Sequence, residues 1–87
     1  MAHFVYIIYS DSHDIYYKGE SASVFLRLEY HNRDMNKYTR GKGPWRLVYY
    51  CEMVDRSAAL RREKEIKRLN RRSIEKLIKD SSNRMPG

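Results

Sequence analysis

HFVYIIYS, residues 3–10, is an almost unbroken run of β-branched and aromatic side chains. A run this short gives no basis for assigning a helix, and its composition is typical of a buried strand. The turn sequence DSHD and then the segment IYYKG, residues 15–19, follow directly. Together these segments predict a β-hairpin whose second strand ends at Gly19.

A first helix and a long polar loop are predicted after the hairpin. Ser21 or Ser23 caps the helix, because a side-chain oxygen at this position accepts a hydrogen bond from an otherwise unpaired amide. The helix runs to about Arg33, and its apolar stripe consists of Val24, Phe25 and Leu28. The loop, DMNKYTRGKGP at 34–44, contains two glycines and a proline. Loops of this length in small domains are often functional.

One more strand and two more helices complete the predicted order. WRLVYYCEMV reads as the third strand, and Asp55 or Ser57 caps the main helix, SAALRREKEIKRL. Ser73 starts a shorter helix, IEKLIK. The order β-β-α-β-α-α predicts an α+β fold, with one three-stranded, mainly antiparallel sheet flanked by helices.

Composition limits the kind of protein this can be. Residues 1–80 are expected to form one domain, followed by a disordered tail at 81–87. The net charge of +7 and the pI near 9.7 favour an anionic partner, nucleic acid before membrane. The single cysteine, Cys51, excludes an internal disulfide and is interpreted as a core residue. No signal-peptide pattern or membrane-spanning run is present, so a cytoplasmic protein with no membrane partner is expected.

Glu63 occupies an unexpected position on the main helix. At 100° per residue, Glu63 falls on the same narrow stripe as Ala59 and Ile66 and should face the sheet. Charged side chains are rarely buried unless they are paired or bind a metal ion. Both explanations are open, and the candidate partners for an ion pair are Arg62, Arg27 and Lys67.

Four other side chains are candidates for chemistry. Arg27 and His31 are four residues apart, so they share a face at the rim where the first helix meets the sheet. Taken alone, they read as a solvated arginine and a hydrogen-bonded rim histidine. Tyr6 and Tyr17 lie on the hairpin strands, where tyrosine is common. Because Tyr16 and Tyr17 point to opposite faces, at most one of them is expected on the packed face.

Several familiar sites are absent from the sequence. The three histidines, His3, His13 and His31, have no metal-ligand spacing, so zinc is not expected. The segment GKGP lacks the flanking pattern of a phosphate-binding loop, and no nucleophile elbow is present.

Five segments together resemble the GIY-YIG nuclease superfamily, and most closely its small stand-alone bacterial proteins. They are FVYIIYS, YYKGES, FLRLEYHN, YTRGKGPWRLVYY and RSAALRREKEIKRL, and the resemblance covers residues 4–79. The family's Gly-Ile-Tyr motif falls on residues 4–6 and its Tyr-Ile-Gly motif on residues 17–19. The resemblance implies a three-stranded antiparallel sheet flanked by helices, and metal-dependent hydrolysis of DNA phosphodiester bonds.

The same resemblance implies roles for five residues. Glu63 binds a single Mg²⁺ (or Mn²⁺), a hard cation that retains several waters and therefore needs few protein ligands. Arg27 holds the scissile phosphate with its planar guanidinium. Tyr6, hydrogen-bonded near His31, helps to deprotonate the attacking water, which requires positive charge nearby to lower the phenol pKa. Tyr17 orients the water or the phosphate.

The sequence departs from the family pattern at three places. Phe4 replaces the glycine of the first motif, as in the small stand-alone group. Lys18 replaces an apolar residue of the second motif, and either contacts phosphate or disturbs packing. The best-studied members carry an asparagine well downstream of the glutamate, whereas here Asn70 comes too soon and Glu75 stands twelve residues on.

The long loop is expected to contact DNA. Basic residues alternate there with Tyr38 and Trp45, a mixture suited to phosphate contact and base stacking, although Trp45 fits a core position equally well. The basic residues assigned to DNA binding are Lys18, Lys37, Arg40, Lys42 and Arg46. Seven more extend the track along the last helices: Arg61, Arg62, Lys64, Lys67, Arg68, Arg71 and Arg72. No base-reading module is present, so recognition of DNA structure or backbone is expected.

Three functions account for these features to different extents. The leading interpretation is a metal-dependent DNA endonuclease that serves repair or recombination and recognises structure rather than sequence. The alternative is a non-catalytic nucleic-acid-binding module that retains the fold, favoured by the unmatched asparagine and by Lys18. A protein-interaction adaptor built on the tyrosine-rich face explains neither Glu63 nor the Arg27–His31 pair, and the sequence specifies no protein partner.

Overall fold

The computed structural model describes residues 2–81, and within them three strands and three helices follow one another in the order β-β-α-β-α-α. The strands are β1 (His3–Ser10), β2 (Ile15–Ser21) and β3 (Trp45–Met53). The helices are α1 (Val24–Asn32), α2 (Arg56–Lys67) and α3 (Arg71–Ser81). β1 is the central strand and is antiparallel to both neighbours, so β2 and β3 are the two edges of the sheet. The predicted α+β class is confirmed.

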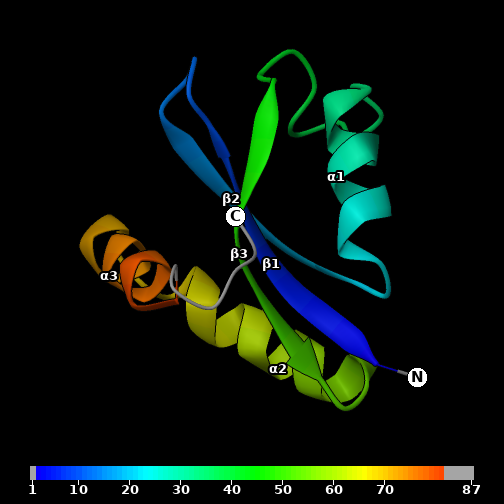
Figure 1. Cartoon of the computed structure of the whole chain (residues 1–87), viewed down its shortest axis with the longest axis vertical. Coiled ribbons are helices and arrows are strands. Elements are labelled where there is room, and N and C mark those ends of the chain that lie inside the picture. Colours follow the sequence, from blue (N-terminus) through cyan, green and yellow to red (C-terminus); the bar gives the residue numbers. More distant parts are fainter. Residues whose placement is uncertain (1, 82–87) are drawn as a thin grey trace.

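Both faces of the sheet are covered (Figure 1). Val5 and Ile7 of β1 face α2 and α3, where they pack with apolar residues of these helices, Ala59, Ile66, Ile74, Leu77 and Ile78. Tyr6 and Ile8, which alternate with them, face α1 and pack with Val24 and Trp45. We refer to these as the α2/α3 face and the α1 face. The fold therefore has two cores, one on each side of a single sheet.

Two packed faces change the expectation for the neighbouring tyrosines of β2. Tyr16 packs on the α2/α3 face and Tyr17 on the α1 face, and both are half-buried. The prediction that at most one of them joins a packed face was therefore wrong. It assumed one buried face, whereas helices on both sides give each tyrosine a surface to pack against.

A bulge in β3 lets that strand contribute to both cores. Ile7 pairs with Tyr49 and Ile8 pairs with Leu47, so Val48 is an extra residue between two successive pairs. Leu47 packs on the α1 face, whereas Tyr49 joins the α2/α3 face. Without the extra residue, the alternation of side chains would place Leu47 and Tyr49 on the same face.

The loop between α1 and β3 is held at both ends. Asn32 clamps the start of β3, because its side-chain amide donates to the carbonyl of Trp45 (3.0 Å) and accepts from the Trp45 amide (2.6 Å). The Ser10 hydroxyl donates to the carbonyl of Lys42. Trp45 is only 3% exposed and its indole N–H donates to the carbonyl of Thr39 (3.3 Å). Trp45 is thus a core residue, and the alternative in which it stacks on DNA is wrong.

The start of α1 differs in detail from the prediction. The helix begins after Ser23, one of the two predicted caps, but the Ser23 side chain makes no capping hydrogen bond. Instead, the hydroxyl of Ser21 accepts from the Ser23 amide and donates to its carbonyl. Phe25, assigned to the apolar stripe, is 75% exposed. Only Val24 and Leu28 of the predicted stripe pack against the sheet.

Carboxylate and amide side chains determine where the last two helices begin. The Asp55 carboxylate accepts from the Ala58 amide (2.9 Å), so Asp55, rather than Ser57, caps α2. The Asn70 side chain accepts from the Ser73 amide (2.8 Å), and α3 accordingly starts at Arg71, before the predicted Ser73. Of the predicted tail at 81–87, Ser81 is the last residue of α3, and 82–87 lie outside the described residues. None of the helices within 2–81 is long and apolar enough to cross a membrane.

The two helix starts give a matched test of capping. We expect Asp55→Ala to lower the free energy of unfolding by about 1 kcal/mol, because an amide of the first turn loses its acceptor. Ser23→Ala should cost less than half as much, since no capping bond is lost. Urea unfolding followed by circular dichroism measures both. Equal losses would contradict the assignment of the two caps.

Candidate active site

Tyr6 lies directly over Gly19, its partner across the β1–β2 pairing. A methyl group placed on Gly19 would come 2.5 Å from the Tyr6 hydroxyl oxygen and 2.7 Å from Cζ of the ring. Real Cβ atoms essentially never approach a nonbonded atom this closely, so the phenol in this position needs a residue without a side chain beneath it. The backbone of β2 thereby fixes where the Tyr6 hydroxyl lies.

The Tyr6 hydroxyl is the first member of a buried hydrogen-bonded line. It lies 2.9 Å from Nε2 of His31, and Nδ1 of His31 lies 2.7 Å from the Thr39 hydroxyl. His31 is 1% exposed, with the rings of Tyr17 and Tyr30 at centroid distances of 4.9 and 5.6 Å. The prediction of a rim histidine was therefore wrong. The loop residue Thr39 and these aromatic rings enclose a side chain that α1 alone would leave at its edge.

Burial sets the protonation of this line. Removal from water, with the positive charge of Arg27 nearby, lowers the pKa of His31 to about 4, so the imidazole is neutral near pH 7. Burial also raises the pKa of the Tyr6 phenol above its ordinary value near 10. The charge of Arg27 acts in the opposite direction but is outweighed. The positive charge that a base role of Tyr6 requires is thus present in Arg27, but in the protein by itself it does not offset the effect of burial on the phenol pKa.

Three charged groups act on the same phenol. Arg27, one turn before His31, favours the ionised phenolate, whereas Glu63 and Glu20 disfavour it. The Arg27 guanidinium lies over the ring of Tyr30, 4.7 Å from its centroid. Arg27 is half-buried rather than fully solvated, because this ring supports it. Charged side chains from α1, α2 and β2 therefore all influence the pKa of one hydroxyl group on β1.

Glu63 faces the sheet, as the helical stripe predicted. Its neighbours on the stripe, Ala59 and Ile66, are fully buried, and the Glu63 side chain is 15% exposed. Oε1 of Glu63 forms an ion pair with Nζ of Lys67 (3.2 Å). Of the three candidate partners, Lys67 is thus the one that pairs with it, whereas Arg62 pairs with Glu65.

Comparison with known proteins decides the family. The protein-family model described as the GIY-YIG catalytic domain matches residues 2–84 of the sequence. The chain belongs to the GIY-YIG family. GIY-YIG domains form a nuclease superfamily, so the resemblance inferred from the sequence is confirmed.

The relatives of this GIY-YIG domain are small proteins matched over most of their length. A UPF0213 protein of Staphylococcus aureus is 40% identical over 80 residues, which are 91% of this chain and 96% of that protein. A UPF0213 protein of Natronomonas pharaonis is 37% identical over 81 residues, 92% of this chain and 94% of that protein. The solution NMR structure of a UPF0213 protein from Bacillus halodurans is 38% identical, with a TM-score of 0.58, and the match covers 91% of this chain and 84% of that one.

The GIY-YIG motif residues surround the Tyr6–His31 line. Tyr6 ends the first motif, Tyr17 and Gly19 belong to the second, and all three lie on the paired strands β1 and β2. Phe4, in place of the first-motif glycine, packs edge-to-face with Tyr50, and the two ring centroids lie 6.3 Å apart. Lys18, in place of the usual apolar residue, is half-buried, and β2 continues unbroken past it to Ser21.

Glu63 is the residue that fits a metal ion. No group of three or more histidine, cysteine, aspartate or glutamate side chains in the described chain is arranged to hold a metal. A single carboxylate suits Mg²⁺, because this ion keeps several waters and completes its shell with substrate oxygens. The Lys67 ammonium shows that Glu63 Oε1 attracts a cation. The donor chemistry therefore fits a hard cation with one protein ligand, at the oxygen that Lys67 now contacts.

The residues at the place of the family's downstream asparagine serve other contacts. Asn70 caps α3. Glu75 pairs with Arg71 on the same helix (Nε to Oε2, 3.4 Å) and accepts from the Tyr16 hydroxyl (3.4 Å). Asn70 is thus engaged at the start of α3, and Glu75 connects α3 to Tyr16 of β2.

The basic residues predicted to bind DNA do not form one patch. Lys18 lies beside the site, and Lys42 lies over the ring of Tyr38, with Nζ 4.4 Å from its centroid. Lys37 and Arg40 are exposed on the loop. Arg46 lies on the opposite face of the sheet from Tyr17, where it pairs with Asp11 (3.0 Å) and covers the ring of Tyr9. Arg46 thus lies on the same side of the sheet as Lys18, whereas Lys42 lies with Tyr38 next to Tyr17 on the other side.

Sequence reasoning missed two contributors to the site. Thr39 holds His31 from a loop that shows no periodicity, and no local signal distinguishes its hydroxyl from others there. Tyr30 supports Arg27 from one turn further along α1, a pairing that the three-residue spacing of an arginine and an aromatic residue makes visible in hindsight.

We expect Gly19→Ala to lower the free energy of unfolding by about 1–3 kcal/mol, because the new methyl group overlaps the Tyr6 phenol. Gly43→Ala is the control, since a methyl group there meets nothing closer than 3.5 Å. Combining Gly19→Ala with Tyr6→Phe should recover part of the loss, because the hydroxyl is the group that the methyl approaches most closely. Urea unfolding of the wild type, Gly19→Ala, Tyr6→Phe and the double variant measures this coupling. Additive losses would contradict it.

The depressed pKa of His31 predicts a pH dependence of stability. An unfolded histidine binds a proton near pH 6.5, whereas His31 in the fold resists protonation down to about pH 4. The stability that neutral His31 contributes is therefore complete above about pH 6.5 and declines, by up to about 3 kcal/mol, as the pH falls toward about 4.

Urea unfolding at several pH values tests this expectation against two variants. His31→Gln should flatten the decline between about pH 6.5 and 4, whereas the exposed His13→Gln should retain it. Carboxylates titrate similarly in all three proteins, so their effect cancels in the comparison. NMR titration of the imidazole provides a direct check, and a His31 midpoint near its ordinary value would be inconsistent with a neutral buried imidazole.

Proposed function

We propose that this GIY-YIG domain is an endonuclease that hydrolyses DNA phosphodiester bonds with a divalent metal ion, Mg²⁺ or Mn²⁺. The observation that carries the proposal is the convergence on the Tyr6 hydroxyl. His31 lies within hydrogen-bond distance of it, and the charges of Arg27 and Glu63 both act on it. A phenol, a neutral imidazole, a guanidinium and a carboxylate in one place suit the hydrolysis of a phosphate ester. Packing of an apolar core would not require these groups.

Arg27 is the residue that we assign to the scissile phosphate. Its guanidinium is always charged and its planar set of donors matches two phosphate oxygens. Stacking on Tyr30 restricts the side chain before any substrate arrives. Less freedom is then lost on binding, and the positive charge is already placed where negative charge develops in the transition state.

Tyr6 acts here as a neutral phenol. With the imidazole proton on Nδ1, where the N–H donates a hydrogen bond to the Thr39 hydroxyl, Nε2 of His31 accepts a hydrogen bond from the Tyr6 hydroxyl. The oxygen lone pairs of Tyr6 are then free to accept a hydrogen bond from the attacking water and orient it. The role of Tyr6 as base would need more positive charge than Arg27 provides, since burial raises the phenol pKa. Tyr17, whose ring neighbours His31, bounds the place where water and phosphate meet.

Glu63 would hold the metal ion, with Lys67 displaced from Oε1. When bound there, the ion supplies positive charge that polarises the phosphate and steadies the leaving oxygen. DNA is the proposed partner, in structures that arise during repair or recombination. Because the bound phosphates release counterions, affinity should fall steeply with salt.

A non-catalytic nucleic-acid-binding module is the second candidate. Two observations favour it. The ion pair with Lys67 balances the charge of Glu63 without a metal. Asn70 and Glu75 are engaged in capping and docking α3, so part of the usual GIY-YIG site is unmatched. Either function would retain the fold and bind DNA, and metal-dependent turnover separates them.

Cleavage of a panel of labelled DNAs, with and without Mg²⁺, tests the proposal. The panel comprises duplex, single strand, flap and branched junction. We expect metal-dependent nicking that Glu63→Gln reduces at least about 100-fold, because this variant removes the charged ligand at nearly constant shape. Glu65→Gln is the matched control on the exposed side of α2 and should cut like the wild type.

Two results would count against the endonuclease. Nicking that Glu63→Gln leaves unchanged would point to a contaminating nuclease. If wild type and Glu63→Gln bind DNA equally and neither cuts any member of the panel, the binding module becomes the better description.

A further inference from the structure

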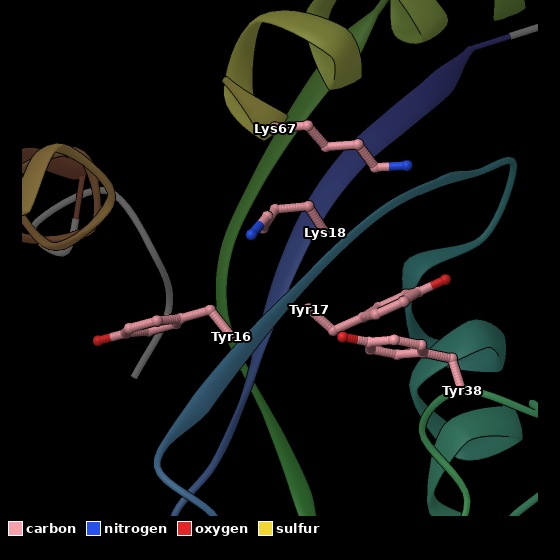
Figure 2. A pocket seen from close by; sticks show the side chains of 5 residues that line it. All are labelled: Tyr16, Tyr17, Lys18, Tyr38 and Lys67. Atoms are coloured by element: carbon pink, nitrogen blue, oxygen red, sulfur yellow. The ribbon is translucent and has the colours of Figure 1, made fainter. Parts of the chain in front are cut away.

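A hollow of about 490 Å³ opens along the free edge of β2, next to the site (Figure 2). It is lined by Tyr16, Tyr17, Lys18, Tyr38 and Lys67, and we call it the Tyr38 hollow. Figure 2 shows Tyr17 and Tyr38 side by side on one flank, Tyr16 on the other, and Lys67 reaching over from α2. Its volume is within the range of small-molecule sites.

The lining of the Tyr38 hollow has the chemistry of a nucleotide site. Its side chains are three tyrosines and two lysines, with no carboxylate and no aliphatic residue. Aromatic rings stack with nucleobases of any sequence, and ammonium groups bind phosphate. An apolar peptide would cover the Lys18 ammonium without giving it an anionic partner, so the lining fits an aromatic anion better than a hydrophobic partner.

Tyr38 is both exposed and held in place. Its side chain is 64% exposed, although large aromatic residues are usually buried. Its backbone amide donates to the Asn36 side chain (2.8 Å), and its ring lies 5.7 Å from that of Tyr17 at an interplanar angle of 35°. Lys42 lies over the ring with Nζ 4.4 Å from the centroid. These contacts position an exposed ring without covering most of its surface.

A second hollow of about 250 Å³ extends this surface away from the site. It shares Tyr16, Lys18 and Tyr38 with the first and continues to Arg71 and Ile74. Two of the lining residues also connect the Tyr38 hollow to the site itself. The Tyr17 ring neighbours His31, and Lys67 pairs with Glu63. A chain molecule bound along the edge of β2 would therefore pass from Arg71, over Tyr38, to Glu63.

We propose that the Tyr38 hollow binds one unpaired nucleotide of a DNA strand, with the base stacked on Tyr38 and the adjoining phosphate bound by Lys18. The placement of this nucleotide beside the cleaved bond rests on the function proposed above. A base in duplex DNA has both faces covered by its neighbours, so it cannot stack on Tyr38 without leaving the helix. The hollow thus selects single-stranded, flap or otherwise unpaired DNA.

Binding measured without metal tests this inference separately from catalysis. Fluorescence anisotropy in EDTA follows a labelled oligothymidine of about 12 nucleotides and a duplex of the same length. We expect Tyr38→Ala to weaken single-strand binding about tenfold, and Tyr38→Phe, which keeps the ring, to stay within about twofold. Phe25→Ala is the matched control, because Phe25 is also exposed (75%) but lies on α1 outside the hollow.

Two further measurements separate stacking from phosphate contact. Replacing one thymidine at a time by an abasic residue should weaken wild-type binding at one position and leave Tyr38→Ala unaffected there. Lys18→Gln should lower the slope of log affinity against log salt by about 0.7, the value for one phosphate of a single strand. Cleavage of the same strands with Mg²⁺ is recorded in parallel.

Each outcome then decides one proposal. Binding that depends on Tyr38 without any cleavage supports the hollow and contradicts the endonuclease. Cleavage with Tyr38→Ala binding and cutting like the wild type overturns the hollow and leaves the endonuclease in place. The hollow is also overturned if single strands do not bind, or if duplex binds as tightly with the same dependence on Tyr38.

Discussion

The hydrogen bond between the Tyr6 hydroxyl and His31 joins the sheet to α1, and the rest of the site is arranged around it. The second nitrogen of His31 reaches Thr39, whose carbonyl in turn accepts from the indole of Trp45. One line of polar contacts therefore links β1, α1, the long loop and β3 inside the α1 face. Buried polar groups of this kind are stable only when each has a partner, so the line fixes a single arrangement of the four segments.

An edge strand lets both sides of the sheet contribute to this site. Glu63 and Lys67 come from the helix on the α2/α3 face, whereas Tyr6, Tyr17 and Tyr38 belong to the α1 face. In the middle of a sheet, these groups would be separated by backbone. β2 has no neighbour on its outer side, and groups from both layers border the hollow beside it (Figure 2). The three-stranded order β2-β1-β3 is thus a condition for the site as well as for the cores.

The parts of this structure that the sequence predicts are those that local physics determines. Short β-branched and aromatic runs gave the strands, and the helical period placed Glu63 against the sheet. The depth of His31 depends on Thr39 and on rings from other elements, and the burial of both Tyr16 and Tyr17 depends on a second layer of helices. The direction of the Tyr6 pKa shift depends on desolvation that no motif encodes. The sequence therefore does not show how deeply a side chain is buried by residues that are distant from it along the chain.

Lys67 connects the two proposals through one ion pair. Its ammonium contacts Glu63 and also borders the Tyr38 hollow, so it is available to a carboxylate or to an incoming phosphate. A cation at Glu63 would release Lys67 toward the phosphate, and a phosphate that draws Lys67 away would free Glu63 for the cation. Thermodynamic linkage makes the two effects equal in free energy. In the absence of DNA, the pair keeps a partly buried carboxylate neutralised, which explains how Glu63 is tolerated on an otherwise apolar stripe.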